Sequence, residues 1–174
     1  MTSSKKLLII TASNGENLKL ANRFLKSCEE KQINSTIMDL TTLDLPLYNP
    51  RTHAEKGIPN SISEINAKIS AFPRWIICAP EYNGSIPPIL TNLIAWLSVQ
   101  GEDFRILFNG RPIAMASFSG GGGMEILLSL RIQLTHLGAQ VVGRQLMSNH
   151  QKIAKDEAIS DLIDRLMQMN QLKL

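Results

Sequence analysis

Three short polar segments of the sequence carry residue types that can hold a small molecule. They are Thr11–Asn17 (TASNGEN), Pro80–Ile86 (PEYNGSI) and Ser117–Gly123 (SFSGGGG), here called the first, second and third polar segments. Each follows an apolar run and precedes a helical pattern. Loops of this kind offer backbone N–H groups, hydroxyls and amides, which bind anions and flat heterocyclic rings through hydrogen bonds.

The second polar segment interrupts the apolar run that ends at Cys78. Its Asn83-Gly84 pair predicts a turn with a positive φ at the glycine and with exposed peptide N–H groups. A flavin ring needs N–H donors beside N1, O2 and N5 together with apolar walls, and this turn can supply both. The ordinary alternative is that Tyr82 is a core aromatic tucked under the loop. Glu81 could act as a general acid or base, but no carboxylate or histidine pairs with it locally.

The first and third polar segments are each open to two interpretations. Thr11, Ser13 and Asn17 lie at a predicted helix start, where neutral donors can hold a phosphate, although ordinary turn and cap residues explain them equally well. The glycines of the third segment let a backbone approach a flat ligand, or they form only a flexible connection. The sequence contains no Gly-Lys-Ser or Gly-Lys-Thr of a Walker loop, and the glycine run lacks the spacing of a dinucleotide fingerprint.

The composition predicts one globular domain over residues 1–174, with 44% hydrophobic and 19% charged residues. A formal net charge of +3 without a basic stripe suits small anionic ligands and argues against nucleic acid. No apolar run reaches membrane-spanning length, and the run at 7–10 is too short for a signal peptide, so we expect a cytoplasmic protein. Cys28 and Cys78 are predicted to be buried thiols, and no metal site is expected.

Strand and helix patterns alternate along the chain. The predicted strands are Lys5–Thr11, Ser35–Leu40, Arg74–Ala79, Pro112–Ser117 and Ala139–Gly143. The predicted helices are Asn17–Glu30, Ser61–Ala71, Pro87–Val99, Glu125–Leu137 and Asp156–Met169, with a long loop at Thr41–Asn60. Nearly all-apolar strands separated by helices predict an α/β fold, a flavodoxin-like three-layer sandwich around a five-stranded parallel sheet of order 2-1-3-4-5. This order brings the three polar segments to one sheet edge, where ligands bind in such folds.

A long part of the sequence resembles the NADPH-dependent FMN reductase family, which includes quinone, chromate and azo-dye reductases. The run Pro80–Ser98, PEYNGSIPPILTNLIAWLS, is similar to the family signature PEYNGSIPG-x-LKNAIDWLS. LPLYNP at 45–50 resembles the family's loop after its second strand, and Leu130-Arg131 and Leu137-Gly138 resemble its later Leu-Arg and Leu-Gly pairs.

The chain also departs from the family pattern. The first loop of the family usually reads G-S-x-R-x-x-S-x-N, whereas the first polar segment is about two residues shorter and lacks the arginine. Gly15 stands where the phosphate-binding serine would be, and Thr91 and Ala95 replace a usual lysine and aspartate.

The resemblance implies a flavodoxin-like enzyme that binds FMN and takes electrons from NADPH or NADH. Hydride would pass through FMN to quinones, azo compounds, metal oxyanions or flavin, and a homodimer or homotetramer is implied. The implied cofactor-binding residues are Thr11, Ser13, Asn14, Gly15, Asn17, Pro80, Glu81, Tyr82, Asn83, Gly84, Ser117, Gly120 and Gly121. No catalytic side chain is assigned, because the cofactor performs the hydride chemistry. The alternatives are a flavodoxin-type electron carrier without its own nicotinamide reductase activity and a scaffold that has lost its flavin.

Overall fold

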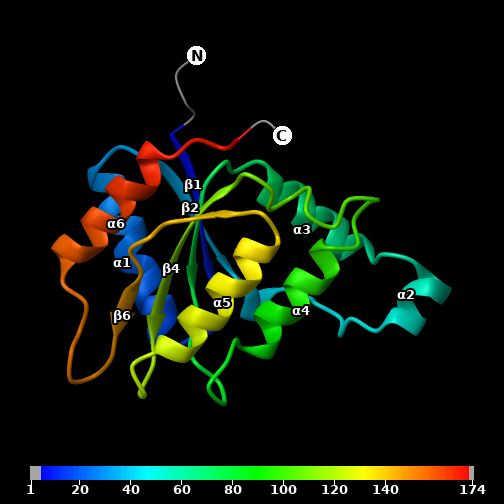
Figure 1. Cartoon of the computed structure of the whole chain (residues 1–174), viewed down its shortest axis with the longest axis horizontal. Helices are drawn as coiled ribbons and strands as arrows, with labels where there is room; N and C mark the ends of the chain where they lie inside the picture. Colours follow the sequence, from blue (N-terminus) through cyan, green and yellow to red (C-terminus); the bar gives the residue numbers. More distant parts are fainter. Residues whose placement is uncertain (1–4, 173–174) are drawn as a thin grey trace.

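A parallel sheet forms the middle layer of the computed structural model, which describes residues 5–172 (Figure 1). Its strands are β1 (Lys6–Thr11), β2 (Asn34–Asp39), β3 (Trp75–Cys78), β4 (Pro112–Phe118), β5 (Gln140–Val141) and β6 (Leu146–Ser148). They run in the order β2-β1-β3-β4-β5, and β6 pairs with β4 in the same parallel sense. The predicted flavodoxin-like order is confirmed.

Helices cover both faces of this sheet. They are α1 (Glu16–Glu30), α2 (Pro50–Lys56), α3 (Asn60–Ser70), α4 (Pro88–Leu97), α5 (Met124–His136) and α6 (Asp156–Gln168), with a 3₁₀ turn η1 (Leu40–Thr42) after β2. Helices α1 and α6 lie on one face, and α3, α4 and α5 lie on the other (Figure 1). The predicted three-layer sandwich is therefore confirmed.

Alternation of side chains along the strands produces two hydrophobic cores, one on each side of the sheet. In β1, Leu7 and Ile9 belong to the core under α1 and α6, whereas Leu8 and Ile10 belong to the core under α3, α4 and α5. Because both faces are covered, β1, β3 and β4 are apolar almost throughout, whereas the edge strand β2 is more polar.

The prediction of a single fifth strand at Ala139–Gly143 was wrong in detail. The chain pairs with β4 over β5, leaves the sheet, and pairs with β4 again over β6. The detour is held by Arg131, whose guanidinium donates to the Val142 carbonyl at 2.9 Å and to Gln145 Oε1 at 3.1 Å. Polar residues interrupt the apolar pattern between β5 and β6, so no apolar run indicated a further strand.

The predicted loop Thr41–Asn60 contains helix α2, which the sequence analysis missed. Asn49 caps this helix by accepting from the N–H groups of Arg51 and Thr52 at 2.9 and 3.3 Å, and Pro50 occupies its first position. The helix buries no residue, so it has no apolar stripe that a periodicity search could detect. Figure 1 shows it standing out at one side of the domain.

Arg111 at the amino end of β4 is a buried cation whose polar groups have partners. Its guanidinium donates to the Leu107 carbonyl at 2.7 Å and to the Phe72 carbonyl, and it lies 4.4 Å from the centre of the Trp75 ring. Burial lowers the pKa of Arg111 to about 10. The Arg111 side chain thus links the amino ends of β3 and β4.

Replacing Arg111 with alanine is expected to lower the free energy of unfolding by about 2–4 kcal/mol, because two carbonyl groups lose their donor. Urea unfolding measures the change. Arg105→Ala is the control, since Arg105 lies 4.9 Å from the ring of the exposed Phe104 and its loss should cost less than about 1 kcal/mol. Equal losses in the two variants would contradict this role for Arg111.

Candidate functional site

The register of the sheet brings the three polar segments to one level. Thr11 in β1 lies opposite Cys78 in β3, and Cys78 lies opposite Ala116 in β4. The pairing continues just beyond the strands, because Ala12 donates to the Cys78 carbonyl at 3.0 Å and Ala79 donates to the Ala116 carbonyl at 3.1 Å. The segments consequently leave the sheet side by side at its carboxyl edge, the lower edge in Figure 1.

The first polar segment presents a row of free backbone donors. Within residues 5–172, the N–H groups of residues 13–17 donate no hydrogen bond. Gly15 is the N-cap of α1 and provides no side-chain cap, while the Thr11 hydroxyl donates to the Ser13 carbonyl at 2.9 Å. Free N–H groups at a helix start favour an anion. The negative charge of Glu16 disfavours an anion at this helix start. Lys19 reduces that effect, because its ammonium group forms an ion pair of 2.6 Å with the Glu16 carboxylate.

The second polar segment forms a tight two-residue turn. Tyr82 and Ser85 exchange two backbone hydrogen bonds of 3.0 Å, and both residues between them are left-handed, with φ of +51° at Asn83 and +68° at Gly84. This is the pattern of a type I′ turn, and it confirms the positive φ predicted at the glycine. Tyr82 is 51% exposed, so the alternative of a core aromatic is wrong.

The third polar segment approaches the end of β4 closely. A Cβ built on Gly123, where φ is +78°, would lie 2.6 Å from the Ser117 hydroxyl oxygen, so a larger residue cannot occupy this position without displacement. Ser119 donates its N–H to the Ser148 carbonyl at 3.1 Å, which fixes the segment to β6. Gly120 and Gly121 are exposed.

Asn17 joins the first polar segment to the third. Its Nδ2 donates to the Phe118 carbonyl at 2.9 Å, and its Oδ1 accepts from the Phe118 N–H at 2.8 Å. The side chain is only 2% exposed. It is therefore a buried clamp between the start of α1 and the end of β4, and Gly15 rather than Asn17 caps the helix.

Two buried oxygens at this edge have no hydrogen-bond partner among residues 5–172. They are Oε2 of Glu81 and the hydroxyl oxygen of Ser117. Buried polar atoms are normally paired, because leaving one unpaired costs about 1–3 kcal/mol. Both oxygens are covered by protein atoms, so it is the free N–H groups that suit a ligand, one with several acceptors.

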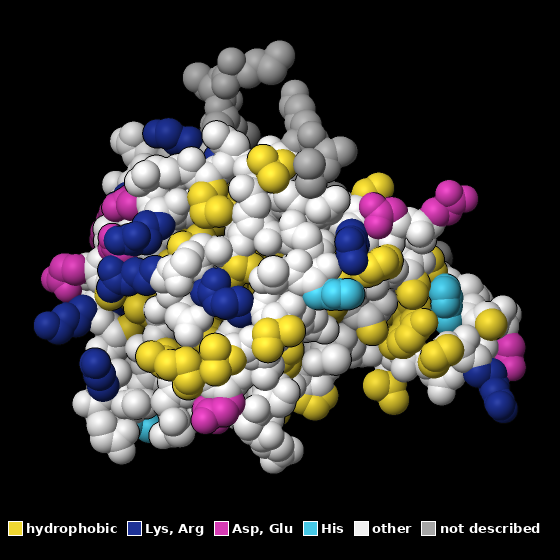
Figure 2. All heavy atoms as spheres, in the orientation of Figure 1, with side chains coloured by type: hydrophobic (Ala, Val, Ile, Leu, Met, Phe, Trp, Pro, Cys, Tyr) yellow, Lys and Arg dark blue, Asp and Glu magenta, His cyan; other side chains and the backbone are white. Residues whose placement is uncertain are grey.

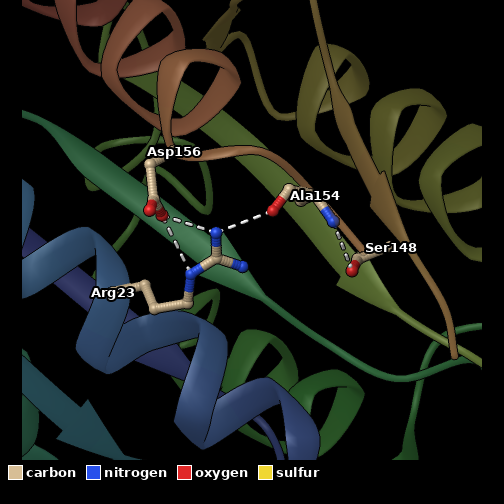
Figure 3. A network of polar contacts seen from close by, with 4 residues as sticks. All are labelled: Arg23, Ser148, Ala154 and Asp156. Atoms are coloured by element: carbon tan, nitrogen blue, oxygen red, sulfur yellow. Dashed lines mark hydrogen bonds and ion pairs between the residues drawn. The ribbon is translucent and has the colours of Figure 1, made fainter. Parts of the chain in front are cut away.

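The loop after β6 reaches the same edge and was missed by the sequence analysis, which did not predict β6. Arg23 of α1 binds Asp156 Oδ1 at 2.5 Å and the Ala154 carbonyl at 2.7 Å, while the Ser148 hydroxyl accepts from the Ala154 N–H at 3.0 Å (Figure 3). These contacts fix the loop beside α1. They place the exposed His150 ring edge-on to Phe118, with centroids 5.0 Å apart.

Two surface grooves lie near this edge without coinciding with it. One of about 630 Å³ runs between α1 and α6 and is lined mainly by charged side chains. The other, of about 600 Å³, lies between β6 and α6 and reaches Gly122 of the third polar segment. The first and second polar segments line neither groove.

The structure brings the predicted site residues together along this edge. Thr11, Asn17 and Ser117 are buried, and Ser13, Pro80 and Glu81 are partly buried. The remaining predicted residues are exposed, namely Asn14, Gly15, Tyr82, Asn83, Gly84, Gly120 and Gly121. Their role in holding a cofactor stays a prediction.

Cys28 and Cys78 are free and fully buried, as predicted. Burial raises the pKa of the Cys28 thiol to about 11 and also raises that of Cys78. Neither thiol is therefore a nucleophile near neutral pH.

The sheet order and the flanking helices define a flavodoxin-like fold. The family model described as NADPH-dependent FMN reductase matches residues 5–152, and the chain belongs to this family. It is 32% identical over 103 residues to a quinone reductase of Escherichia coli, a match that covers 58% of this chain and 53%, about half, of that protein. It is 27% identical over 172 residues to a probable NADPH:quinone oxidoreductase 2 of Oryza sativa subsp. japonica, covering 94% of this chain and 83% of that one.

Solved structures support the same fold. The NAD(P)H:acceptor oxidoreductase FerB of Paracoccus denitrificans superposes with a TM-score of 0.74 at 20% identity, covering 95% of this chain and 98% of that chain. A flavodoxin from the domain Archaea superposes with a TM-score of 0.60 at 12% identity, covering 94% of each chain. At these identities the likeness establishes the fold alone.

Replacing Asn17 with alanine is expected to destabilise the protein by about 2–4 kcal/mol, because the N–H and carbonyl groups of Phe118 both lose their partner. FMN affinity should fall as well, since the first and third polar segments are no longer clamped together. Thermal melting and FMN titration measure the two effects separately. Asn14→Ala, in the same segment but exposed, should leave the melting temperature unchanged. An Asn17→Ala protein that melts like the wild type would contradict the clamp.

Proposed function

We propose that the chain binds FMN non-covalently at the carboxyl edge of its sheet and passes hydride from NADPH or NADH to small-molecule acceptors. The observation that carries the proposal is the set of unpartnered N–H groups that the polar segments gather at this edge. Quinones are the acceptor class named for two relatives, and azo compounds, metal oxyanions and free flavin are further candidates.

Each polar segment has a distinct task in this proposal. The N–H groups of residues 13–17 hold the phosphate with neutral donors, in place of the arginine usual in the family. The N–H groups of residues 83 and 84, which also donate no hydrogen bond within residues 5–172, face the ring acceptors. Gly120 and Gly121 allow the backbone to approach the ring. When bound, FMN supplies the centre that accepts and releases hydride.

FMN rather than FAD is proposed, because no second dinucleotide motif exists for an adenosine half. The protein residues bind and orient the cofactor, and none is assigned to proton transfer. Among residues 5–172, no helix combines the length and the apolar character that a bilayer span requires. A cytoplasmic location, without a nucleic acid or membrane partner, is part of the proposal.

A homodimer or homotetramer is also part of the proposal. Helix α5 exposes Met124, Leu128 and Ile132 at 41%, 50% and 72%, and their spacing of four residues aligns them on one face. Figure 2 shows apolar side chains gathered on the side of the molecule where α5 faces the viewer. An exposed apolar helix face is typical of a protein–protein contact.

The proposal is tested by adding FMN to the purified protein, removing the excess, and recording absorbance anaerobically. A yellow protein that bleaches with NADPH or NADH and regains colour with a quinone is the expected result. Free FMN at the same concentration is the control and should not bleach on this timescale. A yellow protein inert to both nicotinamides would instead indicate a flavodoxin-type carrier. A protein that stays colourless would contradict the flavin site.

A further inference from the structure

The groove between β6 and α6 has an apolar lining and adjoins the third polar segment. Its volume of about 600 Å³ is that of a pocket for a small organic molecule, and it reaches Gly122 of the glycine run. Met147 and Ile153 line it and are 42% and 63% exposed, while Leu146 and Ala154 in its lining are buried. Large apolar side chains exposed in a groove suit a flat organic ring.

The charged residues of this groove favour an anion. Five of them line it, namely Arg144, Lys152, Lys155, Glu157 and Asp161. Both acids also line the groove between α1 and α6, so they lie on the ridge of α6 that separates the two grooves. The charge of Asp161 is offset, because its carboxylate forms ion pairs with Arg144 at 2.6 Å and with Arg165 at 2.7 Å.

The two lysines of the groove remain available to a ligand. Lys152 and Lys155 are exposed and form no ion pair within residues 5–172. Figure 2 shows Lys and Arg side chains gathered on the side of the molecule where α6 lies. Lysine ammonium groups of this kind bind phosphate.

The loop that carries both lysines is held in a fixed shape. Asn149 Oδ1 accepts from the Lys152 N–H at 2.6 Å. The Ser148 hydroxyl accepts from the Ala154 N–H at 3.0 Å, and Arg23 donates to the Ala154 carbonyl at 2.7 Å (Figure 3). The groove is therefore formed before a ligand arrives, which lowers the entropic cost of binding.

We propose, on the basis of the proposed function, that the groove between β6 and α6 binds the adenosine end of NADPH and selects NADPH over NADH. A ribose and a pyrophosphate separate the adenosine from the nicotinamide, so the adenosine lies beyond the flavin when the two rings stack. The purine packs against Met147 and Ile153. The 2′-phosphate, which NADH lacks, carries roughly −1.5 to −2 charges and contacts Lys152 and Lys155.

Two nucleotides without a nicotinamide test this site. Adenosine 2′,5′-bisphosphate is the adenosine end of NADPH, and adenosine 5′-monophosphate lacks the 2′-phosphate. Calorimetry measures the affinity of both for the full chain and for Lys152→Gln/Lys155→Gln. The control is Lys26→Gln/Lys68→Gln, which removes the same charge from two exposed lysines that also form no ion pair within residues 5–172. Thermal melting shows that each variant is folded.

The wild type and the control should bind the bisphosphate more tightly than the monophosphate. Lys152→Gln/Lys155→Gln should bind the bisphosphate about tenfold more weakly or worse, as for loss of hydrogen bonds to a charged group. Its KM should rise for NADPH and stay unchanged for NADH. Equal bisphosphate affinities in the two double variants, or equal affinities of the wild type for both nucleotides, would overturn the inference. A wild type that binds no FMN would overturn the proposed function, and that result is distinct because the bisphosphate titration needs no flavin.

Discussion

The parallel register of β1, β3 and β4 is the constraint on which the site depends. Backbone hydrogen bonds align Thr11 with Cys78 and Cys78 with Ala116, so β1 and β3 end at one level and β4 ends two residues further on, at Phe118. The three segments that follow must then meet, whatever their side chains are. The chemistry of the edge comes from what those segments leave unpaired, because a helix start, a type I′ turn and a glycine run all expose peptide N–H groups.

Polar side chains bind backbone groups at both ends of the sheet. At the amino end, Arg111 donates to two carbonyl groups, and Gln140 donates to the Gly110 and Asn170 carbonyls at 2.6 and 2.7 Å. At the carboxyl end, Asn17 is fully engaged with Phe118, but oxygens of Glu81 and Ser117 have no partner among residues 5–172. Side-chain hydrogen bonds to backbone groups therefore stabilise both ends of the sheet.

Much of this arrangement could be predicted from the sequence, because it depends on local patterns. Apolar periodicity located the long helices, and Asn83-Gly84 indicated the turn that the structure contains. Helix α2 was not predicted because it has no apolar stripe. Its sequence signals are only an N-cap residue and a proline in the first turn. Long-range contacts escaped for a different reason. The bonds between Asn17 and Phe118 join residues 101 positions apart, and no local pattern encodes such a pairing.

We propose that the three polar segments together form one FMN site. The most direct test is an FMN titration of ¹⁵N-labelled protein followed through its backbone amide resonances. If the three segments form one site, the largest shifts are expected at residues 13–17, 81–84 and 120–123, all with one saturation curve. Shifts confined to the grooves beside α6, or different saturation curves for the three segments, would contradict it.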